Sequence, residues 1–447
     1  MEINQTIFHA YDVRGKYPEE VNEESAYKIG RAFVTFLDKK KPKVSAGQDM
    51  RLSSPSLFKA LVRGMTDQGA DVVDVGLATT PMLYFSTVRF KLDGGVHVTG
   101  SHIPGNFNGF KFVREKAIPV SEESGLKEIK ELALKNDFKN QKLGKIFRKK
   151  ILNDYIKNAF RLADRKKINN LKVVVDAGNG MGGLVAEPLF KRLKCELIPL
   201  YFEPDGSFPH HVPNPLIAEN TVELRRKIIE EKADLGIALD GDVDRVAFFD
   251  EQGEMISGDI ITALLSNILL RDKKGQKIIY DVRSSWVVEE EVVKSGGVPL
   301  RFKVGHSLIK EKMRQDDVMF GGELTGHYYL RENNFIEAPL FVILEILGLV
   351  SSENKPLSEI VKPLKRYFTS GEINFEVNDK LGKLREIERH YTGFKLSYLD
   401  GLSIENKDWW FNIRPSNTEN LLRLNIEAKN REIMEAKKKE LTALIQR

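Results

Sequence analysis

The feature that most constrains the fold is a pattern that recurs three times: an apolar strand, a polar loop containing glycine, and a helix. In the clearest case, the strand 171–176 ends in the glycine-rich run 177–183 and is followed by a helix. Strands that alternate with helices in this way form β-α-β units, in which helices cover a sheet. The intervals between the three rounds differ too much for a repeat array. The pattern therefore predicts three related α/β domains with mixed sheets.

The length of the chain agrees with this division, because 447 residues are too many for one hydrophobic core. From about residue 366 the pattern changes to short alternating segments, such as 373–377, and a charged helix closes the chain. We expect a smaller α+β domain there, able to move against the other three around a central cleft. The predicted domains are residues 1–150, 151–254, 255–365 and 366–447.

The composition is that of a soluble globular protein, with 41% hydrophobic and 30% charged residues. The 69 basic and 64 acidic residues leave a net charge of +5, and no basic block is interleaved with aromatic residues. We therefore expect no nucleic-acid partner. The single cysteine, Cys195, cannot form an internal disulfide. No signal-peptide pattern opens the chain, and the most apolar helix candidate, 338–350, is too short to span a bilayer. We expect a cytoplasmic protein without a membrane partner.

A serine stands where the apolar strand 96–98 breaks off into a loop of glycine, proline and asparagine residues. The pattern predicts that a buried strand delivers Ser101 to this loop and that Lys111 returns on the next strand. A loop serine with a lysine close by can be an activated nucleophile, and an ordinary connection between two strands is the alternative. Histidines that follow or close such loops are candidates for polar contacts or proton transfer. These histidines are His102, His306 and His327.

Three carboxylates two residues apart follow another apolar strand, in the run DGDVDR. Asp240, Asp242 and Asp244 would repel one another unless a cation neutralises them, and alternate residues of an extended segment share a face. Carboxylate oxygens suit Mg²⁺, a hard cation that leaves coordination positions for water or phosphate. A solvated acidic turn is the alternative. The spacing does not fit a calcium-binding loop.

Two further loops carry groups suited to a phosphosugar. The run RPSNTE and the following Arg423 supply two guanidinium groups, two hydroxyls and an amide, which fit a phosphate clamp. The run GGELTGH supplies a carboxylate, a hydroxyl and an imidazole on a glycine-rich backbone, and sugar hydroxyls need such paired donors and acceptors. A capped surface turn and a plain loop are the respective alternatives.

Together these stretches resemble the α-D-phosphohexomutases, and within them the phosphomannomutase/phosphoglucomutase branch. The family's serine loop usually reads TASHNP followed by NGFK, and here it reads TGSHIP followed by NGFK. The family's metal loop DGDxDR is intact, its sugar loop GEMSGH is present as GELTGH, and its phosphate loop is present as RPSNTE. The stretches YDVRG, GQDMRLSSP, KVGH and DGSFPHHVPNP also match. The resemblance therefore spans all four predicted domains.

The departures from the family pattern are local. Gly100 replaces the usual alanine and Ile103 the usual asparagine of the serine loop. Thr325 replaces a serine but keeps the hydroxyl, and Asn420 replaces a proline that normally stiffens the phosphate loop. None of these changes removes a chemical group that the family's mechanism needs.

The resemblance implies that Ser101 is carried as a phosphoserine and that Mg²⁺ is bound by its phosphate with Asp240, Asp242 and Asp244. The phosphoryl group would pass to a hexose phosphate and form a bound hexose 1,6-bisphosphate, which is intermediate and activator. After the sugar turns over, the other phosphate would return to the serine. Residues expected near the transferring phosphate are Arg14, Arg245, Lys111 and His102, with Lys111 or His306 as general acid/base.

Substrate recognition, by the same resemblance, belongs to other loops. The residues expected to hold the non-transferring phosphate are Arg414, Ser416, Asn417, Thr418 and Arg423. Glu323 and Thr325 are expected to bind the sugar O3 and O4. His327 and Arg283 are further expected substrate contacts.

The resemblance implies a reversible conversion of hexose 1-phosphate and hexose 6-phosphate, with mannose, glucose or both as the sugar. A phosphoglucosamine mutase is the alternative within the family, but that branch usually has SGTE and GEQSGH where this chain has SNTE and GELTGH. A phosphatase with an aspartate nucleophile would leave the serine loop unexplained, and a non-catalytic sugar-phosphate sensor usually shows eroded motifs. We expect a monomer or homodimer that acts on a small phosphosugar.

Overall fold

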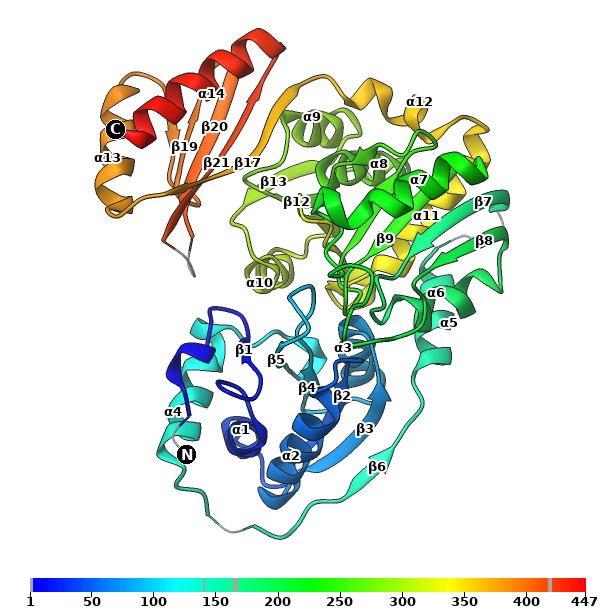
Figure 1. The fold of residues 1–447 in the computed structure, drawn as a ribbon, viewed down its shortest axis with the longest axis vertical. Coiled ribbons are helices and arrows are strands. Elements are labelled where there is room, and N and C mark those ends of the chain that lie inside the picture. Colours follow the sequence, from blue (N-terminus) through cyan, green and yellow to red (C-terminus); the bar gives the residue numbers. More distant parts are fainter. Residues whose placement is uncertain (1–2, 140, 164–167, 417–419) are drawn as a thin grey trace. The chain divides into compact units, whose positions relative to one another are not determined.

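The structure is a computed structural model that describes residues 3–139, 141–163, 168–416 and 420–447 (Figure 1). The chain forms two compact units, each made of two segments. The first unit comprises Met1–Ser257 and Thr325–Ile360, and the second comprises Gly258–Leu324 and Val361–Arg447. Within the described ranges, no helix combines the length and apolar character needed to cross a membrane.

The first sheet, in the first unit, has six strands: β1 (Val13–Lys16), β2 (Lys43–Gln48), β3 (Asp71–Leu77), β4 (Gly94–Val98), β5 (Phe107–Arg114) and β6 (Ile146–Arg148). Their order is β1-β5-β4-β2-β3-β6, in which β5 runs antiparallel to both of its neighbours and the other five strands share one direction. All five residues of β4 are buried, as a short apolar strand inside a helix-covered sheet should be.

Four helices accompany this sheet: α1 (Glu23–Phe36), α2 (Ser54–Asp67), α3 (Thr80–Arg89) and α4 (Lys127–Lys135). Helices α1 and α2 lie side by side (Figure 1). Gly30 and Gly64 permit this close approach, because a Cβ atom at either position would lie within 2.4 Å of a carbonyl oxygen of the facing helix. Apolar side chains from these helices and from the central strands form one continuous core. The helices thereby fix the strand ends that carry the polar loops.

The second sheet, also in the first unit, has five strands: β7 (Asn169–Asp176), β8 (Lys194–Leu200), β9 (Leu235–Leu239), β10 (Val246–Phe249) and β11 (Met255–Ile256). The order is β11-β10-β9-β7-β8, with β9, β7 and β8 parallel. The helices are α5 (Leu152–Leu162), α6 (Gly182–Phe190), α7 (Val222–Glu231) and α11 (Pro339–Glu353). The unit also contains the antiparallel pair β15 (Tyr328–Leu330) and β16 (Ile336–Glu337).

The first segment of the second unit contains a parallel group of three strands: β12 (Lys277–Asp281), β13 (Val298–Phe302) and β14 (Phe320–Gly322). Its helices are α8 (Gly258–Leu270), α9 (Trp286–Lys294) and α10 (His306–Asp316). The short helix α12 (Leu357–Val361) leads into the last part of the chain. Each strand of this group again ends in a polar loop, as in the first two sheets.

The last sheet is entirely antiparallel, in the order β17-β21-β20-β19-β18. Its elements are β17 (Phe368–Glu376), β18 (Lys395–Ser397), β19 (Leu402–Glu405), β20 (Trp409–Pro415), β21 (Leu421–Ala428), α13 (Lys380–His390) and α14 (Arg431–Gln446). Helix α14 packs against β17 and β21, over a core that includes Phe411 and Leu424. The predicted fold class, three mixed-sheet α/β domains and a smaller α+β domain, is confirmed.

Candidate active site

Ser101 lies in the loop after β4, at the end of that strand, as the sequence predicted. Its side chain is largely buried, and its backbone adopts a left-handed conformation with φ of 49°. The hydroxyl oxygen Oγ lies 3.2 Å from Asp240 Oδ2, to which it donates, and 3.2 Å from His102 Nδ1. Left-handed backbone is unfavourable for a residue with a Cβ atom, so the surrounding structure must hold this conformation.

The three aspartates of the loop after β9 form one buried cluster. Asp240, Asp242 and Asp244 are at most 3% exposed, and one oxygen from each lies within 4.8 Å of the others. Gly241 brings the loop against the serine, because a Cβ atom there would lie 2.3 Å from the carbonyl oxygen of Ser101. The structure therefore joins the nucleophile candidate and the metal-ligand candidates in one place within the first unit.

Lys111, on β5, supplies a positive charge to this cluster. Its Nζ lies 2.7 Å from Asp242 Oδ2 and 2.6 Å from Asp244 Oδ2. Burial alone would lower the pKa of Lys111, but the two carboxylates outweigh it and hold the pKa well above its ordinary value. The ammonium group is therefore charged at neutral pH and compensates part of the negative charge.

The cluster fits a divalent cation. Burial, with Asp244 and Asp242 as neighbours, raises the pKa of Asp240 well above its ordinary value, so the site holds more carboxylate charge than Lys111 compensates. Among the residues that the structure describes, no group donates a hydrogen bond to the buried Asp242 Oδ1. Buried carboxylate oxygens that face one another without donors are typical ligands of a hard cation.

Residues around the cluster hold its members in place. Thr80 Oγ1 donates to Asp242 Oδ2 at 2.5 Å, and His327 Nε2 lies 3.3 Å from Asp244 Oδ1. Arg245 donates from its backbone N–H to Asp240 Oδ1 at 3.1 Å and from Nε to His327 Nε2 at 3.3 Å. The predicted residues Arg245 and His327 therefore lie at the cluster.

His102 and Arg14 lie on the serine side of this site. Burial, followed by the positive charge of Arg245, lowers the pKa of His102 well below its ordinary value, so its imidazole is neutral at neutral pH. Arg14, on β1, is among the charges that act on His102, and its Nε lies 3.3 Å from Asp12 Oδ1. His102 therefore contacts Ser101, and the charge of Arg14 acts on His102.

In the second unit, three arginines converge on one carboxylate. Arg414 Nη2 lies 2.8 Å from Glu372 Oε2, and Arg423 Nη1 lies 3.3 Å from Glu372 Oε1. Arg283 Nη1 lies 3.8 Å from Glu372 Oε2, while its Nε and Nη2 donate to Asp281 at 2.9 and 2.8 Å. Burial, and then Arg283 as a like charge, lowers the pKa of Arg414. Such a group of guanidiniums attracts anions.

The phosphate-clamp candidates Arg414, Ser416 and Arg423 lie together. Arg423 Nη2 donates to Ser416 Oγ at 3.4 Å, and the backbone N–H of Ser416 donates to the carbonyl of Leu421 at 2.8 Å. The predicted contacts Asn417 and Thr418 lie outside the described residues.

The sugar-loop candidates divide between the units. Glu323, in the second unit, is 2% exposed, and its Oε2 accepts the backbone N–H of Gly305 at 3.4 Å. His306 follows Gly305 as the first residue of α10. Thr325, in the first unit, lies with its Oγ1 3.2 Å from His327 Nδ1. Thr325 is thus linked through His327 to the aspartate cluster.

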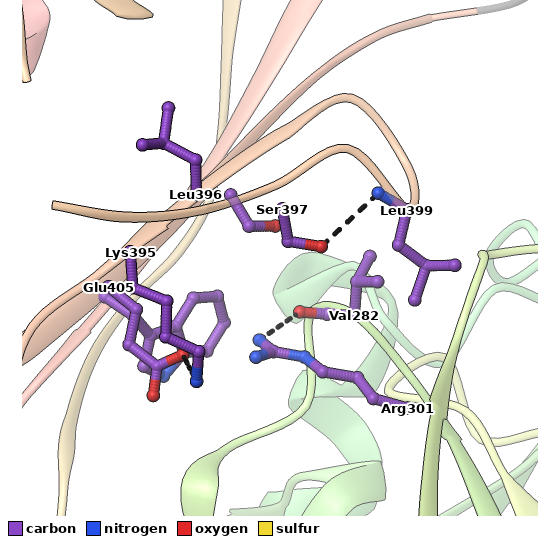
Figure 2. Close-up of a pocket in the computed structure, with 9 residues that line it drawn as sticks. Val282, Arg301, Lys395, Leu396, Ser397, Leu399 and Glu405 are labelled. Carbon is purple, nitrogen blue, oxygen red and sulfur yellow. Dashed lines mark hydrogen bonds and ion pairs between the residues drawn. The ribbon is translucent and has the colours of Figure 1, made fainter. Parts of the chain in front are cut away.

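A cavity of about 30 Å³ in the second unit is shown in Figure 2. Arg301 donates to the carbonyl of Val282 at 2.8 Å and stacks over the ring of Trp410 at 4.8 Å, while Lys395 and Glu405 form an ion pair of 3.0 Å at its edge. This volume holds about two water molecules. The cavity is too small for a phosphosugar.

Three functional candidates were missed at the sequence level: Arg51, Thr80 and Glu372. Arg51 and Thr80 lie three residues beyond the ends of β2 and β3, which run parallel to β4. The carboxyl ends of parallel strands meet at one edge of a sheet, so both positions could have been recognised beside Ser101. Glu372 lies within β17 and pairs with arginines 42 and 51 residues away. No local signal marks it.

Four family models match successive parts of the chain. They describe phosphoglucomutase/phosphomannomutase alpha/beta/alpha domain I at residues 5–140, domain II at residues 152–253, domain III at residues 257–367 and the C-terminal domain at residues 372–444. All four domains occur in the order that the motifs indicated.

Individual proteins are similar over nearly the whole chain. A phosphomannomutase of Vibrio cholerae is 40% identical over 458 residues, covering 99% of this chain and 98% of its own. A phosphomannomutase of Escherichia coli is 40% identical over 453 residues, covering 98% and 99%. The crystal structure of a phosphoglucomutase/phosphomannomutase family protein from Burkholderia thailandensis matches with a TM-score of 0.92 at 30% identity, covering 99% of this chain and 98% of that chain.

Proposed function

Because the chain belongs to the phosphoglucomutase/phosphomannomutase family and is a mutase that interconverts hexose phosphates, we propose that Ser101 carries the transferring phosphoryl group. The observation that supports this role most strongly is the 3.2 Å contact of Ser101 Oγ with Asp240, in a cluster that also contains Lys111. The names of the relatives favour a mutase over a phosphatase or a sensor. An aspartate nucleophile would also leave the strained serine without a role.

We propose Mg²⁺ as the metal ion, with Asp240, Asp242, Asp244 and the phosphorylated Ser101 as its ligands. The ion would supply charge neutralisation to the phosphoryl group during transfer. Three acidic oxygen donors at a buried site match the preference of Mg²⁺ for hard ligands.

In the transfer step, the bond between phosphorus and Ser101 Oγ breaks while a bond forms to a hydroxyl oxygen of the hexose phosphate. The attacking hydroxyl loses its proton and Ser101 Oγ gains one. Lys111, held protonated beside the cluster, is the proposed acid/base: it donates its proton to Ser101 Oγ and takes up the proton that the attacking hydroxyl loses. His306 is the alternative acid/base. The neutral His102 contacts Oγ, and Arg14 and Arg245 would stabilise the charge of the phosphoryl group. The product of the first transfer is a bound hexose 1,6-bisphosphate, which after reorientation returns its other phosphate to Ser101.

The arginines of the second unit are the proposed ligands of the phosphate that is not transferred. The positive charges of three arginines, Arg283, Arg414 and Arg423, lie together around Glu372. Ser416 adds a neutral hydroxyl group beside Arg423. Asn417 and Thr418 are included on the basis of the motif alone. Glu323, Thr325 and His327 are proposed to bind hydroxyl groups of the sugar other than the one at C2. Mannose and glucose phosphates would therefore both be substrates.

We also propose the division into domains, the location of the protein and its assembly. The three domain boundaries proposed from the sequence, near residues 150, 255 and 365, lie close to the limits of the four family models. A cytoplasmic location is consistent with the lack of a membrane-spanning helix in the described ranges. A monomer or homodimer, activated by hexose 1,6-bisphosphate, is proposed from the resemblance.

A substrate panel tests this function. Mannose, glucose and glucosamine 1-phosphates are each incubated with the enzyme, Mg²⁺ and a trace of glucose 1,6-bisphosphate, and the 6-phosphates and free phosphate are measured. We expect isomerisation of the mannose and glucose compounds. Conversion of glucosamine 1-phosphate alone would favour the alternative mutase, and release of free phosphate without isomerisation would contradict the proposal.

A further inference from the structure

The guanidinium of Arg51 is enclosed by the serine loop. Arg51 follows β2, and its side chain is fully buried. Its Nη2 donates to the carbonyl oxygens of Ser101, at 2.9 Å, and of Ile103. Its Nη1 donates to the carbonyl oxygens of Pro104, at 2.6 Å, and of Phe107, at 2.9 Å. One side chain therefore binds four carbonyl groups along the loop that carries the nucleophile.

Asp49 supports the same loop from the other side of Arg51. Its Oδ2 lies 3.3 Å from Arg51 Nε and accepts the backbone N–H of Gly100 at 3.2 Å. Its Oδ1 accepts the hydroxyl of Ser54 and the backbone N–H of Arg51. The carboxylate thus compensates the buried guanidinium and also binds the residue directly before Ser101.

A loop of the second sheet closes this arrangement. The ring of Phe208 faces the Arg51 guanidinium, with its centroid 5.1 Å from Cζ. A Cβ atom at Gly206 would lie 2.5 Å from Arg51 Cα, and one at Gly105 would lie 2.7 Å from the carbonyl oxygen of Gly206. The loop therefore packs directly on both Arg51 and the serine loop.

Gly100 explains how the guanidinium comes so close to the backbone. A Cβ atom at this position would lie 2.4 Å from Arg51 Cζ. The alanine that is usual in the family is replaced here by glycine, and the arginine occupies the space that the methyl group would take. The serine loop of this chain is thus fitted around Arg51.

We infer that Arg51 is a positioning residue that, with Asp49 and Phe208, holds the loop of Ser101 in the geometry for phosphoryl transfer. This inference rests on the proposed role of Ser101. The left-handed backbone of Ser101 aims Oγ at Asp240, and the four hydrogen bonds from Arg51 stabilise that conformation. A planar guanidinium can serve four carbonyls at once, whereas the ammonium group of a lysine is a single point with three donors.

The test compares Arg51→Lys with the matched control Arg31→Lys. Arg31 lies in the same domain, stacks on Phe138 at 4.8 Å and donates to Gln68 Oε1 and to the carbonyl of Lys139, all of which lie outside the serine loop. Because Arg51 acts through Ser101 and not through the sugar-binding groups, we expect Arg51→Lys to lower kcat about 100-fold with little change in KM. Arg31→Lys should retain both parameters.

Amide hydrogen exchange supplies a readout that does not depend on activity. Arg51→Lys should accelerate exchange in residues 99–109 while the rest of the first unit keeps its protection, and Arg31→Lys should leave residues 99–109 unchanged. Phe208→Leu, which removes the ring that faces the guanidinium, should accelerate exchange in residues 99–109 and lower kcat to a smaller extent. This variant replaces Arg51→Lys in the test if Arg51→Lys does not fold. Normal kcat and normal exchange in residues 99–109 in these variants would overturn the inference. If Arg51→Lys accelerates exchange in residues 99–109 but the wild-type protein has no mutase activity, the role of Arg51 in holding the loop would stand. The proposed function would then be contradicted.

Discussion

Lys111 Nζ lies 2.6 Å from Asp244 Oδ2, in the buried centre of the first unit. The same ammonium group contacts Asp242, so one positive charge lies between two carboxylates that sequence analysis assigned to a metal. A buried charge without its partner is strongly unfavourable. The lysine is therefore needed for stability as well as for the proposed proton transfer.

Lys111→Met should abolish mutase activity and lower the stability of the metal-free protein by about 3 kcal/mol, because breaking a buried ion pair leaves uncompensated charge. Thermal unfolding in EDTA and in Mg²⁺ measures this effect. We expect Mg²⁺ to raise the Tm of Lys111→Met more than that of the wild-type protein, since the cation then replaces the missing positive charge. An equal shift in both proteins would contradict the idea that lysine and metal neutralise the same carboxylates.

Glu372→Gln removes the carboxylate that pairs with Arg283, Arg414 and Arg423. We expect inorganic phosphate to inhibit this variant about fivefold more strongly, because the guanidiniums lose a competing anion. Glu376→Gln is the matched control, since Glu376 lies on the same face of the same strand, is exposed and, within the described part of the chain, does not pair with these arginines. Weaker inhibition by phosphate in Glu372→Gln would show that the carboxylate aligns the arginines rather than competing with phosphate.

Ionisation of Glu427 makes the stability of the second unit depend on pH. Burial raises its pKa from 4.5 to about 7, while the backbone N–H of Trp286 and Nε1 of Trp410 donate to its Oε1 at 2.9 and 2.8 Å. The folded state binds the proton of Glu427 more tightly than the unfolded state does, so the contribution of this group to stability is greatest below pH 4.5 and is lost as the pH rises through 7. The expected loss is about 3 kcal/mol.

The measurement is the unfolding free energy of the second unit between pH 5 and pH 8 for the wild-type protein and Glu427→Gln. The amide cannot ionise and keeps an acceptor for both donors, so the variant should lose most of this pH dependence and be the more stable protein at pH 8. Glu405→Gln, which alters a neighbouring acceptor of the Trp286 indole, should retain the dependence. Parallel pH profiles for the wild-type protein and Glu427→Gln would contradict the assignment.

Much of the site could be predicted because its residues stand at the ends of apolar strands. Ser101 and the three aspartates follow β4 and β9, and local chemistry alone marked them as nucleophile and metal ligands. The fold class followed from the same alternation of strands and helices. The contact between the serine loop and the aspartate loop was suggested by the resemblance, since no local pattern specifies which loops meet.

Strand ends could have placed Arg51 and Thr80 near Ser101, but their individual partners could not be predicted because those contacts join residues far apart in the sequence. Arg51 binds carbonyl groups 50 to 56 residues away, and the identity of its partners depends on backbone geometry rather than residue type. Thr80 reaches Asp242 across 162 residues. Glu372 was not recognised because an exposed acidic residue in a strand has no distinguishing pattern. Asn417 and Thr418 lie outside the described residues, so their roles stay predictions.

The central claim is that Ser101 is the phosphoryl carrier, and the location of the phosphate tests it most directly. Wild-type enzyme and Ser101→Ala are incubated with glucose 1,6-bisphosphate, and the intact mass and peptide masses are determined. We expect one added phosphoryl group on the wild-type protein, located at Ser101, and neither phosphorylation nor mutase activity in the folded variant. Phosphate on Asp240, or mutase activity retained by Ser101→Ala, would contradict it.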